Sequence, residues 1–115
     1  MPKKQLKTHF KKLSDNSNLN DIQIYITEMM KANKFNNTPL ELFCYLTEEI
    51  GELAKEIRKC EKNMDMDLNK TYNSCLEHEL ADCFIYLLAI CNQYNIDLFK
   101  AFQNKEKINL ERDWQ

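Results

Sequence analysis

The feature that most constrains the fold is a long stretch of helical spacing over residues 39–62. Its apolar side chains recur every three or four residues, the pattern of a helix with one face against a core. They are Leu40, Phe43, Leu46, Ile50, Leu53 and Ile57. Thr38 and Glu41 have the spacing of a capping box, with Pro39 at the first helical position. The pattern predicts a helix from Pro39 to near Lys62, about 33 Å long at ~1.5 Å per residue.

A second strongly helical stretch follows a polar connector. Ser74 and Glu77 form another predicted capping box, and the helix runs on to a break at Asn95. It is apolar nearly all round, with Leu76, Leu80, Phe84 and Leu87 on one side and Ala81, Ile85 and Ile90 on others. A helix without a polar face has to be covered on several sides. We therefore expect the chain to complete its bundle as a homodimer or homotetramer.

Two further helices are predicted. One is capped by Ser17 or Asn18 and ends near Lys31, and the other runs over residues 98–111 with its cap in the segment 95–97. The chain of 115 residues has a single glycine and two prolines, which favours helices, because all-β folds need frequent turn residues. The fold class predicted is all-α, a four-helix module over residues 17–115. Residues 1–16 hold five lysines and one aspartate. We interpret them as an exposed basic N-terminal arm with at most a short turn of helix around Leu6 and Phe10.

Bulk properties limit the partners and the compartment. A net charge of −2 does not indicate a nucleic-acid partner, although the basic arm could attract one. The five cysteines form no C-x-x-C pair, which favours reduced thiols in a cytoplasmic protein. The sequence has no apparent signal peptide and no apolar run long enough to span a bilayer, so we expect no membrane partner.

Acidic side chains recur at helical spacing on the two long helices. Glu49 and Glu52 lie three residues apart on the first helix, and Glu79 and Asp82 lie three apart on the second. Carboxylates one turn apart repel each other, and close to a core they are costly, so they need a compensating cation. If the helices face each other, these four acids are the expected ligands of Mg²⁺, with Mn²⁺ as a substitute. The alternative interpretation is a solvated acidic face.

Additional residues complete a candidate site for phosphoryl chemistry. Glu48, beside the acids, could accept a proton from an attacking water. Lys105, Asn109 and Arg112 lie four and then three residues apart, and could grip phosphates from one polar helical face. Phe35, in the loop before the acidic helix, is the candidate for stacking on a base.

These residues resemble a known family. Glu48-Glu49-Ile50-Gly51-Glu52 followed by Glu79-Leu80-Ala81-Asp82 is similar to the E-E-x-x-E and E-x-x-D motifs of the MazG-type, all-α nucleoside triphosphate pyrophosphohydrolases. The segment from Lys105 to Trp114 resembles the closing K-x-x-x-N-x-x-R-x-W segment of that family. The resemblance covers about residues 20–114.

The resemblance implies a function and a role for each residue. Glu49, Glu52, Glu79 and Asp82 would bind Mg²⁺, and Glu48, with Glu49, would help to orient or deprotonate the water. Lys105, Asn109 and Arg112 would contact the triphosphate. The expected reaction converts a (deoxy)nucleoside triphosphate into a nucleoside monophosphate and pyrophosphate, a nucleotide-pool house-cleaning activity. It also implies a dimer or tetramer.

Three alternatives remain open from the sequence. The chain could be a non-catalytic helical module that binds a nucleotide or a partner protein, or a plain dimerisation scaffold. It could also be a phosphatase or phosphodiesterase, which would release different products. Gly51, between the acids, is expected to allow close approach of a neighbouring helix.

Overall fold

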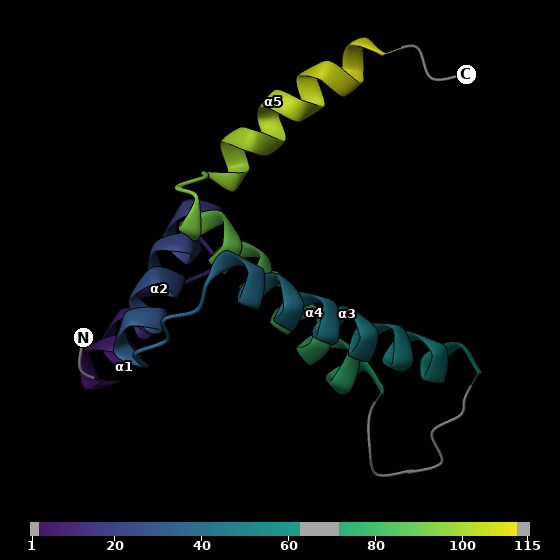
Figure 1. The fold of residues 1–115 in the computed structure, drawn as a ribbon, viewed down its shortest axis with the longest axis horizontal. Helices are drawn as coiled ribbons and strands as arrows, with labels where there is room; N and C mark the ends of the chain where they lie inside the picture. The colour runs from purple at the N-terminus through teal and green to yellow at the C-terminus, as the bar shows by residue number, and fades with distance from the viewer. Residues whose placement is uncertain (1–2, 63–71, 113–115) are drawn as a thin grey trace. The chain divides into compact units, whose positions relative to one another are not determined.

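The computed structural model describes residues 3–62 and 72–112, without the side chains of residues 62 and 72–75. All regular structure in these ranges is helical, which confirms the all-α prediction. The helices are α1 (Lys3–Lys12), α2 (Leu19–Ala32), α3 (Pro39–Lys62), α4 (Tyr72–Gln93) and α5 (Leu98–Glu111) (Figure 1). They belong to two compact units, one formed by residues 1–36 with 91–115 and the other by residues 37–90.

The basic N-terminal segment is more ordered than we expected. It forms a ten-residue helix, α1, in place of a single turn. Leu6 is only 5% exposed, His9 pairs with Glu28 of α2, and the Phe10 ring lies against Tyr25 of α2. The sequence did not indicate this packing face, because lysines dominate the segment and only Leu6, His9 and Phe10 belong to the face.

A buried amide joins α2 to the turn between α4 and α5. The Gln23 side chain is 5% exposed and donates to Asn92 Oδ1 at 3.0 Å and to the Ile96 carbonyl at 2.8 Å. Its oxygen accepts from the Leu98 backbone N–H at 3.1 Å. Asp97 caps α5 by accepting from the Lys100 N–H, so the break and restart predicted at this point are confirmed.

The caps predicted for α2 and α3 are present. Asn18 and Asp21 form a capping box at the start of α2. At the start of α3 the Glu41 N–H donates to Thr38 Oγ1 at 3.1 Å, and the Thr38 N–H donates to Glu41 Oε1 at 2.9 Å. The predicted start of α4 is wrong by three residues, since Ser74 was expected to cap a helix beginning at Cys75 and the helix begins at Tyr72.

The unit of residues 37–90 pairs α3 with α4 as an antiparallel hairpin of helices (Figure 1). The face of α3 that packs agrees with the predicted one only at Leu46 and Leu53. Leu42 and Leu46 are buried, and the half-buried positions continue this line with alternating steps of three and four residues, through Glu49, Leu53, Glu56 and Cys60. Leu40, Phe43, Ile50 and Ile57, assigned to the core from the sequence, are 42–71% exposed.

The structure therefore leaves a second apolar stripe uncovered. On α4, Leu80, Phe84 and Leu87 are 39–50% exposed in addition to the exposed residues of α3. Among the described residues, no other helix approaches Gly51 closely, because a Cβ built on it would meet nothing within 4 Å. None of the described helices is long and apolar enough to cross a membrane.

Candidate metal centre

The packed stripes of α3 and α4 each carry an acid. On α4 the half-buried line runs through Leu76, Glu79, Cys83, Tyr86 and Ile90, again with alternating steps of three and four residues. This is the seam spacing of two helices packed side by side. Glu49 occupies one position of the α3 stripe and Glu79 one position of the α4 stripe, so helical periodicity aims both carboxylates at the partner helix.

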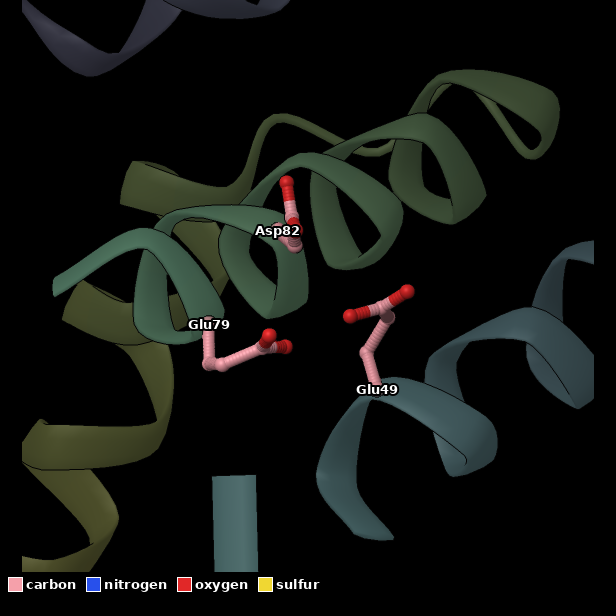
Figure 2. Close-up of side chains that lie close together, drawn as sticks. All are labelled: Glu49, Glu79 and Asp82. Atoms are coloured by element: carbon pink, nitrogen blue, oxygen red, sulfur yellow. The ribbon is translucent and has the colours of Figure 1, made fainter. Parts of the chain in front are cut away.

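Three acids converge at this seam. Glu49, Glu79 and Asp82 each offer a carboxylate oxygen, and these oxygens all lie within 4.8 Å of one another. Figure 2 shows the Glu49 side chain extending from α3 toward the Glu79 and Asp82 side chains of α4. Oxygen ligands from two facing helices suit a hard divalent cation such as Mg²⁺. The predicted facing of the two acidic helices is thus present.

The electrostatics of the group indicate a missing positive charge. The pKa of Glu49 is raised above its ordinary value of 4.5, first by a hydrogen bond with the Glu79 carboxylate, which neutral Glu49 can donate. Partial burial and then the negative charges of Asp82, Glu79 and Glu52 add to the same effect. Without a cation, Glu49 therefore keeps its proton to a higher pH than an isolated glutamate does.

Glu79 provides a second, independent sign. Its Oε2 atom is buried and has no hydrogen-bond partner among the described residues. A buried carboxylate oxygen without a partner loses its hydration and gains nothing in return. A bound cation would supply the missing interaction, so the residues present fit a divalent metal.

Two side chains that sequence reasoning did not select lie beside the acids. The pKa of Tyr86 is raised by burial and then by the charges of Glu49 and Asp82, and the Tyr86 ring packs on Tyr45 with centroids 5.8 Å apart. The pKa of Cys83 is raised by burial and by the charges of Glu49, Glu79 and Asp82. The signal for both was their spacing, since Tyr86 and Cys83 each follow an acid of α4 by four residues.

The remaining predicted acids lie next to the group but outside it. Glu52 is exposed, one turn along α3 from Glu49, and its charge contributes to the raised pKa of Glu49. Glu48 is exposed, and its charge contributes to the raised pKa of Tyr86. Metal binding by Glu52 and water orientation by Glu48 stay predictions.

The predicted phosphate and base ligands belong to the other unit, and their roles also stay predictions. Lys105 and Asn109 lie one turn apart on α5, but Arg112 is the C-cap residue, with an extended backbone beyond the helix. The shared helical face therefore holds for Lys105 and Asn109 only. Phe35 lies in the loop after α2 and is 54% exposed.

Comparison with known proteins identifies the family. Residues 37–113 match the MazG nucleotide pyrophosphohydrolase domain. This match covers most of the chain, including both acidic helices, and the chain therefore belongs to the MazG nucleotide pyrophosphohydrolase family. No curated protein matches the chain. The family implies pyrophosphohydrolase chemistry on nucleotides in general, and its members generally use divalent metals.

Proposed function

We propose that this protein hydrolyses (deoxy)nucleoside triphosphates to nucleoside monophosphates and pyrophosphate with Mg²⁺ bound at the acidic group. The observation that carries the proposal is the convergence of Glu49, Glu79 and Asp82, with a buried unpartnered oxygen on Glu79, in a chain of the MazG family. The reaction breaks the bond between the α- and β-phosphates, and water supplies the new oxygen on the α-phosphorus.

The proposed roles follow the chemistry of each side chain. Glu49, Glu79 and Asp82 hold the ion, with Glu52 as a fourth ligand. When bound, the ion would neutralise charge on the phosphate oxygens and lower the pKa of a coordinated water. Glu48 orients the attacking water and accepts its proton. Lys105, Asn109 and Arg112 bind the phosphates, and Phe35 packs on the base.

We further propose that the working form is a homodimer or homotetramer. The support is the apolar surface on α3 and α4, where Phe43, Ile50, Phe84 and Leu87 are all at least 39% exposed. Burial of such a surface against a second copy would stabilise the assembly by about 25 cal/mol per Å² of apolar area.

The direct test is pyrophosphate release from a panel of (deoxy)nucleoside triphosphates with Mg²⁺. Glu49→Gln and Asp82→Asn remove charge from the group with little change of shape. We expect each to lower turnover by about 100-fold or more, because a ligand of the ion is lost. Glu61→Gln, on an exposed position of the same helix, is the matched control.

Product analysis separates the alternatives. Release of inorganic phosphate in place of pyrophosphate would contradict the assignment and indicate a phosphatase. Nucleotide binding with no product from any substrate of the panel would indicate a non-catalytic member of the family. Unchanged turnover in both Glu49→Gln and Asp82→Asn would remove the acidic group from the mechanism.

A further inference from the structure

Helix α1 is the most strongly charged surface of the described structure. Five of its ten residues are lysines and none is acidic. Lys3, Lys7 and Lys11 recur at steps of four residues on successive turns, and Lys4 and Lys12 flank them. All five are exposed, and Lys4 and Lys12 line an open groove between α1 and α2.

The charge of the chain is strongly divided along the sequence. Residues 1–36 contain seven lysines and three acids, a balance of +4, whereas residues 37–115 carry −6. The whole-chain charge of −2 therefore understates the local field around α1. Lys3 donates to Asn33 at 3.3 Å, which places the start of α1 near Lys31 and Lys34 at the end of α2.

The three acids of this segment lower the positive charge in part, and Glu28 lines the same groove as Lys4 and Lys12. Glu28 is paired with His9, and Asp21 accepts the Asn18 N–H in the capping box of α2. Asp15 lies in the turn after α1. The lysine columns of α1 therefore present a continuous basic surface.

The other face of α1 is already used. Leu6 is buried, and the His9 and Phe10 rings lie 5.5 Å and 5.8 Å from the Tyr25 ring. With Leu6 held against α2, Phe10 is the one large apolar side chain of α1 left exposed, which is too little apolar surface to hold a helix in a bilayer. The lysines of α1 instead stand out in fixed columns, as charge-only contacts to phosphates require.

An exposed aromatic side chain borders the lysines. Phe10 is 59% exposed, although its ring also packs on Tyr25. A ring fixed on one side and open on the other is a stacking platform for an unpaired base, and bases stack on such rings with little sequence preference. Basic side chains beside an aromatic platform are the combination found in proteins that bind single strands.

We propose that α1 is a binding surface for single-stranded nucleic acid, in which Lys4, Lys7 and Lys11 contact backbone phosphates and Phe10 stacks on a base. The surface lies before residues 37–113, the part that matches the pyrophosphohydrolase domain, and it shares no residue with the proposed catalytic site. It would hold the protein on nucleic acid.

The test is fluorescence anisotropy of a labelled single strand of about 20 nucleotides, as RNA and as DNA, with the full chain. EDTA is present so that the acidic group makes no metal-bridged contact. We expect binding that weakens steeply with salt. Lys4→Gln/Lys7→Gln/Lys11→Gln should reduce the log–log salt slope by about 2, at ~0.7 for each phosphate that a lysine no longer neutralises. Phe10→Leu should weaken binding by about fivefold or more.

Controls make the result specific. Lys55→Gln/Arg58→Gln/Lys107→Gln removes the same charge from exposed positions of α3 and α5 and should retain most of the affinity. Melting curves followed by circular dichroism verify that each variant is folded. Equal weakening by both triple variants, or no weakening by the α1 triple variant, would overturn the proposal.

A competition experiment tests whether α1 prefers single-stranded nucleic acid to other polyanions. Poly-glutamate and vesicles of phosphatidylserine with phosphatidylcholine are titrated against the labelled strand at matched negative charge. We expect both to compete less well than an unlabelled single strand. Tighter binding to poly-glutamate or to vesicles would overturn the assignment to single-stranded nucleic acid. Pyrophosphate release from the α1 variants is measured separately and bears only on the catalytic proposal.

Discussion

At the scale of single residues, the folded chain holds the carboxylates of the acidic group close together, although like charges repel each other. Helical packing brings Glu49 against Glu79, and Glu49 responds with a raised pKa because it can then donate a hydrogen bond to its neighbour. The folded state consequently binds this proton more tightly than the unfolded chain does. Stability associated with Glu49 is therefore lost as pH rises from about 4.5 through the raised pKa, and the loss then levels off.

This sign gives a prediction for the metal-free protein. Glu49→Gln removes the titration, so its free energy of unfolding should fall less than that of the wild type as pH rises from 4.5 to neutrality. Urea unfolding in EDTA at a series of pH values measures the difference, and Glu61→Gln should follow the wild type. Parallel profiles for wild type and Glu49→Gln would contradict the raised pKa.

Magnesium should stabilise the wild type more than the Glu49→Gln variant. A ligand that binds only the folded state stabilises it by mass action. At neutral pH we expect Mg²⁺ to raise the melting temperature of the wild type clearly and that of Glu49→Gln much less. A wild-type melting curve indifferent to Mg²⁺ would count against the metal centre.

The acids of the site could be selected from the sequence, and their neighbours could not. Glu49, Glu79 and Asp82 stood out because like charges at helical spacing near apolar residues are unusual. Tyr86 and Cys83 resembled ordinary core residues of an apolar helix. Each follows an acid of α4 by four residues, but only the pairing of α3 with α4 shows that Glu49 lies close to them as well.

At the scale of helices, caps were predictable and packing faces were not. The capping residues of α2, α3 and α5 contact backbone groups only a few residues away, so these contacts can be predicted from the local sequence. The packed face of α3 depends on α4 instead. The packed stripe shares Leu46 and Leu53 with the predicted one, but Glu49 and Glu56 interrupt it, so periodicity alone favoured the more continuous apolar stripe.

The Gln23 network is the contact on which the α4–α5 turn depends most. Its amide satisfies the Ile96 carbonyl, the Leu98 N–H and the Asn92 side chain. We expect Gln23→Leu to lower the free energy of unfolding by at least about 2 kcal/mol, because these groups lose their partner in a buried position. Urea denaturation measures this, with Gln93→Leu, at an exposed position, as the control. Equal stabilities would show that water replaces the amide.

At the scale of the whole molecule, the chain combines the matched domain with a basic helical extension. The matched region begins at residue 37, after α1 and α2. The fold class followed from the scarcity of glycine and proline, whereas the helix at residues 3–12 did not follow from a segment dominated by lysine. Its stability comes from contacts with α2 that a local pattern does not reveal.

The uncovered apolar stripe predicts the assembly state. We expect light scattering after size-exclusion chromatography to give at least twice the 13.8 kDa mass of one chain. Ile57→Gln/Leu87→Gln, at positions 42% and 43% exposed, should shift the mass toward that of one chain, because the interface then buries less apolar area. Leu110→Gln, 77% exposed on α5, is the control. A monomeric wild type would refute the proposed oligomer.

The stability of a Gly51→Ala variant reports whether a second copy of the chain packs against α3. Within one chain a methyl group at this position would enter open space, so alanine should stiffen α3 and raise the free energy of unfolding by up to about 1 kcal/mol. Urea denaturation of Gly51→Ala reports this gain directly. A loss of stability instead would mean that another copy of the chain brings its backbone against the one residue of α3 that has no side chain.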